Sequence, residues 1–159
     1  MDLICADCIE VLHDLEENSV DLILTDPPYN IDKAYIGYDD NVSSSDYWEW
    51  LDEVWDACYR VLKPKCHLTF TCAQKHIWNH KRICENLGYI FRHQGVWHNP
   101  ARKAGSFPGQ WPFAYEPVMD FTKGGFRKLN NGNCVGYMDV WIEKPPSDVD
   151  HPTPRPTET

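Results

Sequence analysis

The sequence predicts an α/β fold with a mostly parallel β-sheet. Two observations lead to this prediction. Short apolar runs bounded by turn-forming residues, typical of buried strands, recur along the chain, and between them lie segments whose apolar side chains have helical spacing. Because parallel neighbours need a crossover connection, usually a helix, this alternation indicates βαβ units.

The N-terminal segment predicts one such unit. Residues 3–6 are expected to form a strand, residues 8–15 a helix and residues 20–25 a second strand. Three apolar residues lie on one side of the expected helix: Ile9, Leu12 and Leu15. Ligands of open parallel sheets bind at the carboxyl ends of the strands. Asp7 and Asp26 follow the two expected strands, so both are placed at that edge.

A loop and a long helix come next. Residues 31–45 are rich in Asp, Asn, Ser, Gly and Tyr, which predicts a surface loop and a candidate lid over the preceding strand. Asp46 and Glu49 have the spacing of a capping box, and the helix that they open is expected to end before Pro64. Its apolar residues recur at helical spacing and are expected to lie in the core: Trp48, Leu51, Trp55, Cys58 and Leu62.

The second half of the chain continues the alternation. The expected elements are strands at 67–71, 89–97 and 114–122 and a helix at 73–87 that Gly88 terminates. Residues 98–112 form a basic loop with aromatic residues, residues 130–133 signal a turn, and residues 144–159 are a Pro-rich tail. No repeat or domain boundary is evident, so residues 1–159 are expected to form a single domain.

Charge is distributed unevenly along the chain. Residues 1–60 hold 16 acidic and 2 basic side chains, whereas the remainder holds 8 acidic and 13 basic ones. A basic second half suits a phosphate backbone, although a solvated charged face is the commoner explanation of a charge excess. The sequence shows no signal peptide and no apolar run of about 18 residues, which predicts a cytoplasmic protein without a membrane partner. The 7 cysteines, an odd number, indicate reduced thiols.

The run that ends in Asp26-Pro27-Pro28-Tyr29 combines a buried strand with an abrupt stop. Proline has no N–H to donate and fixes its own φ, so the two prolines end the strand and hold the backbone in a stiff path. We call residues 26–29 the ledge. It offers two hydrogen-bond acceptors, the Asp26 carboxylate and the Pro27 carbonyl, beside the aromatic face of Tyr29.

Cysteine and histidine spacing does not predict a metal site. Cys5 and Cys8 have the spacing of a metal-binding or redox pair, but no second such pair completes a four-cysteine site. Four residues recur at every fourth position: Cys72, His76, His80 and Cys84. On a helix the outer two would lie roughly 18 Å apart, so one metal cannot bind all four. Weak chelation by His76 and His80 alone stays open as an alternative.

The ledge, Asp-Pro-Pro-Tyr behind an apolar strand, resembles the catalytic motif of the β-class amino DNA methyltransferases, which methylate adenine N6 or cytosine N4. Further segments resemble elements of the same family in the same order. They are Ala6-Asp7-Cys8-Ile9, Arg60-Val61-Leu62-Lys63-Pro64, Tyr115-Glu116 and His151-Pro152-Thr153-Pro154-Arg155-Pro156. The resemblance implies a Rossmann-like, S-adenosylmethionine-dependent methyltransferase fold and implies DNA methylation, as in restriction-modification systems.

The resemblance also assigns roles to the ledge. Asp26 and the Pro27 carbonyl would accept the two N–H bonds of the exocyclic amine and aim its lone pair at the methyl group of S-adenosylmethionine. The target base would be flipped out of the duplex and would stack on Tyr29. Pro28 belongs to the same catalytic motif. Aspartate at position 26 favours adenine, while N4-cytosine methylation stays open.

Further roles follow from the family motifs. The resemblance implies cofactor binding by six residues: Asp7, Asp26, Pro27, His151, Pro152 and Thr153. Residues 98–143 would include short target-recognition loops. Double-stranded DNA would be contacted by Tyr29, Arg102, Lys103, Lys123, Arg127 and Lys128.

One departure from the family pattern is informative. In family members the His-Pro-Thr element leads to a Phe-x-Gly-x-Gly cofactor loop, and this chain holds no such segment. The sequence therefore predicts a partial catalytic domain, truncated or split, that acts as a homodimer or with a complementing C-terminal fragment. A catalytically inactive DNA-binding remnant is the alternative.

Overall fold

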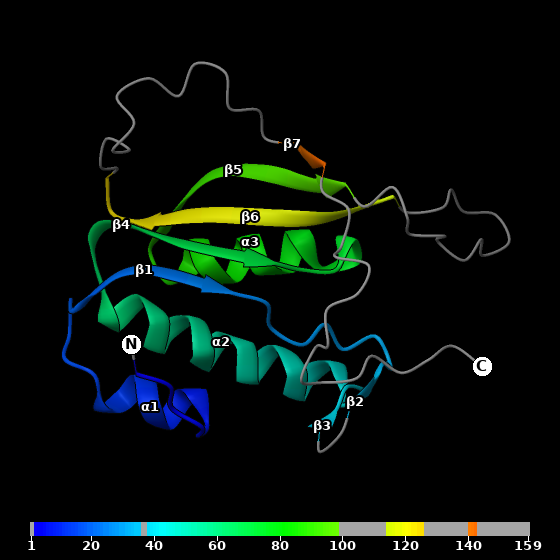
Figure 1. Ribbon diagram of the computed structural model, residues 1–159, viewed down its shortest axis with the longest axis horizontal. Helices are drawn as coiled ribbons and strands as arrows, with labels where there is room; N and C mark the ends of the chain where they lie inside the picture. The colour runs from blue at the N-terminus through cyan, green and yellow to red at the C-terminus, as the bar shows by residue number, and fades with distance from the viewer. Residues whose placement is uncertain (1, 36–37, 99–113, 126–139, 143–159) are drawn as a thin grey trace, which may run out of the picture.

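The computed structural model describes residues 2–35, 38–98, 114–125 and 140–142. Its centre is a five-stranded sheet with the order β1-β4-β6-β5-β7 (Figure 1). The strands are β1 (Val20–Thr25), β4 (Leu62–Thr71), β5 (Tyr89–His98), β6 (Tyr115–Lys123) and β7 (Val140–Ile142). A separate short hairpin is formed by β2 (Ala34–Tyr35) and β3 (Tyr38–Asp39).

The strand directions confirm the predicted α/β class. β1 is parallel to β4, and β5 is parallel to β7. β6 is antiparallel to both of its neighbours, β4 and β5. Four of the five strands therefore run the same way and β6 alone is reversed, so the sheet is mostly parallel, as expected.

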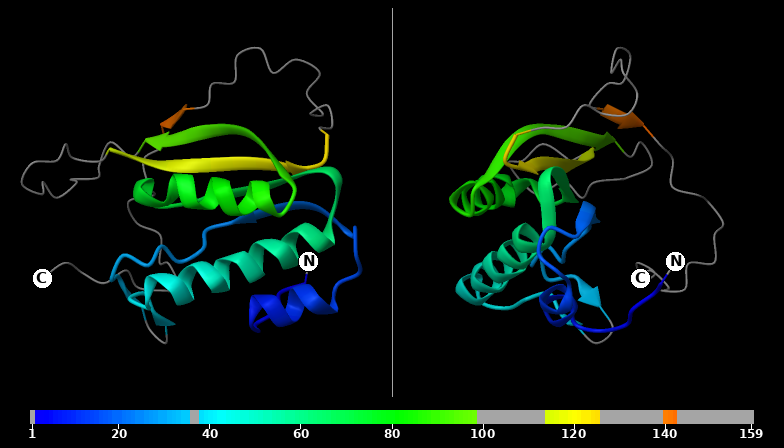
Figure 2. Two further views of the ribbon diagram at one scale, coloured as in Figure 1. Left: turned by 180° about the vertical axis from the view of Figure 1, so that it is seen from behind. Right: turned by 90° about the vertical axis from the view of Figure 1, so that its left-hand side faces the viewer.

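Helices α2 (Ser44–Val61) and α3 (Ile77–Asn86) cover one face of the sheet, and the short 3-10 turn η1 (Gln74–His76) leads into α3 (Figure 2). α1 (Cys8–Asp14) packs on α2. The predicted aromatic stripe of α2 lies in the core: Trp55 is fully buried and stacks on Phe70 of β4, with ring centroids 4.5 Å apart. Phe70 in turn stacks on Phe121 of β6. Burial of such rings drives this helix onto the sheet.

The opposite face of the sheet has no helix over it within the described residues (Figure 2). The register places Leu22 and Leu24 of β1 beside His67 and Thr69 of β4, on the side away from the helices. Asp120 of β6 pairs with Thr69 and faces the same way. We call these five residues the open face. Leu22 is 56% exposed and Leu24 is 73% exposed, on a strand that forms the edge of the sheet.

The strand predicted at residues 3–6 is wrong. These residues have no regular structure, and Leu3 and Ile4 are 86% and 68% exposed. A strand needs a neighbour to satisfy its backbone groups, and no described strand lies beside them. The βαβ unit is instead formed by β1, α2 and β4.

The other differences concern boundaries. α2 begins two residues before Asp46, because Ser43 accepts the Asp46 backbone N–H and is the N-cap in place of the predicted capping box. β4 starts at Leu62 and runs through Pro64. β7 was not predicted, and most of the expected basic loop, turn and tail lie outside the described residues. In the described part, no helix is long and apolar enough to cross a membrane.

Candidate active site

The ledge begins immediately after β1, at the carboxyl end of the strand. Asp26 is exposed, Pro27 is buried, and Pro28 and Tyr29 are half-buried. The parallel register pairs Thr25 of β1 with Phe70 of β4, so the end of β4 lies beside the ledge. The sequence prediction that the ledge stands at the carboxyl edge of a parallel pair is confirmed.

Thr71, the last residue of β4, donates its hydroxyl hydrogen to Oδ1 of Asp26. A hydrogen bond to one carboxylate oxygen restricts rotation of the carboxylate and leaves the other oxygen as an acceptor. No hydrogen bond to the Pro27 carbonyl occurs within the described part of the chain. The ledge therefore offers two acceptors, as the sequence predicted.

Tyr29 is held by its hydroxyl group, which donates to Oε2 of Glu116 on β6 at 3.4 Å. The same hydroxyl interacts with Thr71 and Asp26. Burial raises the pKa of Tyr29, and the nearby Asp26 and Glu116 carboxylates raise it further. Tyr29 is thus a neutral phenol at physiological pH, with its hydroxyl fixed between the ends of β4 and β6.

Tyr47 fixes the backbone of the ledge. This residue lies in the first turn of α2 and is 1% exposed, and its hydroxyl donates to the Pro28 carbonyl at 2.8 Å. The Pro28 carbonyl is therefore occupied, which distinguishes it from the carbonyl of Pro27. The helix that covers the core thus also sets the path of the ledge.

Asp40 organises the segment after the ledge. Its carboxylate, in a residue only 2% exposed, accepts the backbone N–H groups of Asn30, Ile31 and Lys33 at 2.8, 3.1 and 3.0 Å. Its backbone carbonyl accepts the N–H of Asp32 at 3.0 Å. The segment expected to be a lid is accordingly hydrogen-bonded to Asp40 in its described part, and its role as a lid stays a prediction.

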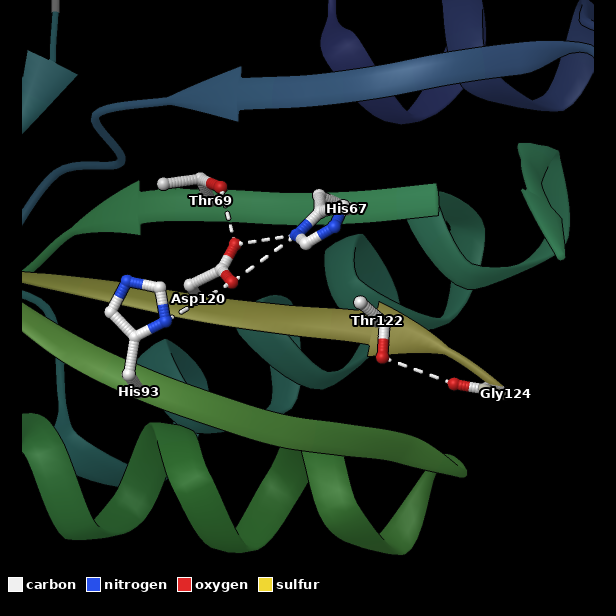
Figure 3. A network of polar contacts seen from close by, with 6 residues as sticks. All are labelled: His67, Thr69, His93, Asp120, Thr122 and Gly124. Carbon is white, nitrogen blue, oxygen red and sulfur yellow. Dashed lines mark hydrogen bonds and ion pairs between the residues drawn. The ribbon is translucent and has the colours of Figure 1, made fainter. Parts of the chain in front are cut away.

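A second polar network lies on the open face, with the helices behind the sheet (Figure 3). The Asp120 carboxylate accepts from the Thr69 hydroxyl at 2.8 Å and lies 3.0 and 3.2 Å from Nδ1 of His67. Nδ1 of His93 on β5 is 3.6 Å away. Asp120 therefore links three neighbouring strands at a point separate from the ledge.

The predicted cofactor and DNA residues are only partly gathered at the ledge. Asp7 is exposed and caps α1, where its Oδ1 accepts the Ile9 N–H at 2.8 Å. Lys123 lies seven residues along β6 from Glu116, roughly 23 Å at the usual strand rise. Its ammonium donates to Asn18 and to the Tyr59 backbone. Lys123 is thus engaged at the opposite end of the sheet from the ledge, and its contact with DNA stays a prediction.

The remaining predicted residues lie outside the described part of the chain: Arg102, Lys103, Arg127, Lys128, His151, Pro152 and Thr153. Sequence reasoning missed Thr71, Tyr47 and Asp40 as site residues. The position of Thr71 at the end of the strand parallel to β1 was the one available signal. Tyr47 and Asp40 act through contacts across 19 and 10 residues of sequence, which no local pattern reveals.

Of the two histidines in the η1–α3 segment, His80 is buried in the core and His76 is half-buried. His80 is 1% exposed, and Trp55 Nε1 donates to its Nδ1 at 3.4 Å, which assigns the ring proton to Nε2. Burial lowers the pKa of His80 to about 3, with a further contribution from His76. No group of three or more potential metal ligands occurs among the described residues. This geometry does not favour the open alternative of chelation by His76 and His80.

Comparison with known proteins identifies relatives of one kind. A family model for DNA methylases, N6_N4_Mtase, matches residues 20–159. The type II methyltransferase M.HpaI of Haemophilus parainfluenzae is 38% identical over 156 residues, which cover 87% of this chain and 49% of the relative. The DNA adenine methyltransferase YhdJ of Escherichia coli K12 is 30% identical over 133 residues, covering 84% of this chain and 45% of the relative.

Solved structures share the fold. The M1.HpyAVI–SAM complex superimposes with a TM-score of 0.66 at 16% identity, covering 94% of this chain and 68% of that protein. The cytosine-N4-specific PvuII DNA methyltransferase gives 0.67 at 18% identity, covering 91% and 57%. The chain spans about half the length of the two curated relatives above. It belongs to the family of N6/N4 amino DNA methyltransferases.

Proposed function

We propose that this chain carries the amine-holding part of an S-adenosylmethionine-dependent DNA methyltransferase, and that its target is the N6 amine of adenine. The ledge is the observation that carries the proposal. Asp26 is exposed and oriented by Thr71, and the Pro27 carbonyl has no partner within the described residues. Together they present two acceptors at the carboxyl end of a parallel strand, where α/β folds bind ligands.

These acceptors suit the chemistry of an exocyclic amine. The nitrogen lone pair is delocalised into the base, so the amine is a weak nucleophile. When Asp26 and the Pro27 carbonyl accept its two N–H bonds, the nitrogen is drawn toward a tetrahedral shape and its lone pair is aimed. S-adenosylmethionine supplies the electrophilic methyl group when bound. The Tyr29 ring, tethered by its hydroxyl, offers a stacking face for a flipped base.

Adenine is favoured over cytosine by the aspartate at position 26, and the relative YhdJ is named as an adenine methyltransferase. PvuII, which shares the fold, is cytosine-N4-specific, so N4-cytosine methylation is the alternative within the same chemistry. The geometry of the two amines is alike. Discrimination between the bases would therefore come from contacts to the ring outside the ledge.

Cofactor and DNA contacts complete the proposal. Asp7 and Asp26 are exposed carboxylates, and they are proposed to bind polar groups of S-adenosylmethionine together with the Pro27 carbonyl. The other proposed cofactor-binding residues are His151, Pro152 and Thr153. Double-stranded DNA would be held by Tyr29 and by five basic residues of the second half of the chain: Arg102, Lys103, Lys123, Arg127 and Lys128. Cytoplasmic localisation remains part of the proposal.

We also propose that a complementing C-terminal polypeptide completes the domain along β1, in preference to a homodimer. Leu22 and Leu24 expose apolar surface on this edge strand, which a further strand and its covering helix would bury.

The proposed reaction is tested by incubating the chain with S-adenosylmethionine labelled in the methyl group and a mixed-sequence DNA duplex. The DNA is then digested to nucleosides and the labelled product is identified by mass spectrometry. N6-methyladenine is expected. N4-methylcytosine would replace adenine as the target, and the absence of labelled base would contradict transfer by this chain.

A DNA-binding remnant without activity is the second candidate, and the partial span of the chain relative to its homologues favours considering it. Calorimetric titration with S-adenosylmethionine separates the two. The enzyme should release or absorb heat with saturation, whereas a remnant should bind DNA and show no heat with the cofactor.

A further inference from the structure

Asp40 receives an unusual concentration of backbone hydrogen bonds. Four successive N–H groups, those of residues 30–33, all donate to this one residue, three of them to its carboxylate. They follow the ledge directly, beginning one residue after Tyr29. Such a set of convergent backbone N–H groups is a concave anion site, of the kind that binds phosphate in other proteins. Here the anion is the protein's own side chain.

The backbone from Asn30 to Asp32 adopts a conformation that needs support from neighbouring groups. Asn30 and Asp32 have φ values of 52° and 62°, in the left-handed region that most L-residues avoid and that Asn and Asp adopt more readily than others. Asn30 is held further by a reciprocal pair of bonds: its Nδ2 donates to the Val42 carbonyl at 3.1 Å, and the Val42 N–H donates to its Oδ1 at 3.0 Å. The segment therefore keeps this shape because Asp40 and Val42 together determine it.

We propose that Asp40 is a positioning residue that fixes the ledge in its amine-binding shape from the downstream side. Tyr47 fixes the Pro28 carbonyl and Thr71 fixes Asp26, and both contacts lie before Tyr29 in the chain. The hydrogen bonds to Asp40 hold the backbone after Tyr29, beginning at Asn30. This inference rests on the proposed function for its catalytic meaning, whereas its structural part stands alone.

The structural part is tested by amide hydrogen exchange, followed by NMR on the 159-residue chain. In Asp40→Asn one acceptor oxygen becomes an NH2 group that faces N–H donors. The amides that faced that oxygen, either Asn30 or the pair Ile31 and Lys33, should then exchange about tenfold faster or more, because they lose a buried hydrogen bond. The matched control is Asp39→Asn, which removes the neighbouring, exposed carboxylate. It should leave these three amides unchanged.

A second variant tests the anion site itself. Asp40→Ala leaves the convergent N–H groups without their carboxylate, and sodium acetate should then slow exchange of the same amides, whereas sodium chloride at equal ionic strength should not. Protection in the core strands, followed at Leu68 and Phe121, should be unchanged in both variants. Equal exchange in the wild type and Asp40→Asn, or loss of protection throughout the sheet, would overturn a local positioning role.

The effect of Asp40 on methyl transfer is measured separately, through kcat and KM. Asp40→Asn should lower kcat for methyl transfer about tenfold with little change in KM for DNA, since positioning acts on the transition state. A rise in KM at unchanged kcat would contradict positioning. If the wild type transfers no methyl group, the proposed function fails, and the exchange data still decide the role of Asp40 in shaping the ledge.

Discussion

At the scale of single residues, the ledge depends on side chains that the motif itself does not contain. Asp26 and Tyr29 are the residues that a four-residue pattern reveals. Thr71, Tyr47 and Asp40 determine where those two groups point. These partners come from β4, α2 and the segment between β3 and α2, so only the folded chain brings them together.

Thr71 provides the first prediction. Thr71→Val keeps the size of the side chain and removes the hydroxyl that orients Asp26. Because a hydrogen bond to a charged group is worth about 1.5–3 kcal/mol, kcat for methyl transfer should fall roughly 10- to 100-fold. Thr71→Ser, which retains the hydroxyl, should restore most of the rate. Initial rates with saturating DNA measure this, and equal loss in both variants would show that the hydroxyl is not the cause.

At the scale of elements, sequence reasoning succeeded where each element carries its own signal. β1 was predicted with its exact bounds, and the aromatic stripe of α2 is buried as expected, because local periodicity reports which side faces a core. The strand at residues 3–6 failed because a strand also needs a partner, which its own residues do not encode. The organisation of the loop after the ledge was not predicted, because a polar loop sequence does not reveal that Asp40 is a buried acceptor around which it folds.

The Asp120 network gives a prediction for the sheet. Asp120→Asn keeps the shape of the side chain but removes an acceptor from a group shared by Thr69 and His67 on β4 and His93 on β5. The free energy of unfolding, from urea titration, should fall by about 1–3 kcal/mol. As a control, Asp21→Asn breaks an exposed ion pair with Lys63 and should cost less than about 1 kcal/mol. Similar losses in both variants would remove any special role for Asp120.

The contact between α2 and α3 gives a pH prediction. Burial disfavours the charged form of His80 and lowers its pKa in the folded state to about 3, from the ordinary histidine value of 6.5. Between these values the unfolded chain binds one more proton than the folded chain. Stability from His80 is therefore complete above pH 6.5 and is lost as the pH falls, by about 1.4 kcal/mol per pH unit. Urea unfolding at several pH values should show this slope reduced in His80→Gln, and an unchanged slope would contradict the assignment.

At the scale of the whole molecule, the helices α2 and α3 cover one face of the sheet, and no helix among the described residues lies over the other face (Figure 2). The edge strand β1 exposes Leu22 and Leu24. The sequence predicted an incomplete cofactor site from the absent Phe-x-Gly-x-Gly segment. It did not predict which surface is left open, because that depends on strand order, which is a property of the folded sheet.

If a complementing polypeptide docks along β1, a charge placed on this strand should block its binding. Leu24→Lys places a charge on exposed surface, so the stability of the chain itself should change by less than about 0.5 kcal/mol. Binding of a polypeptide made from the part of M.HpaI that this chain does not match, measured by calorimetry, should nevertheless be lost. The control is Leu15→Lys. Leu15 is also exposed but lies on no strand, so this variant should leave binding intact. Undiminished binding to Leu24→Lys would exclude the β1 edge as the docking surface.

Replacement of Asp26 by alanine tests the central claim, that the ledge holds the amine during methyl transfer. Asp26 is exposed, so Asp26→Ala should keep the fold and the unfolding midpoint close to those of the wild type. The measurement is incorporation of labelled methyl groups into duplex DNA by the wild type and by Asp26→Ala under identical conditions. With the complementing polypeptide added to both, we expect transfer by the wild type and none by a folded variant. Appreciable turnover in Asp26→Ala would contradict the assignment of the ledge as the catalytic centre.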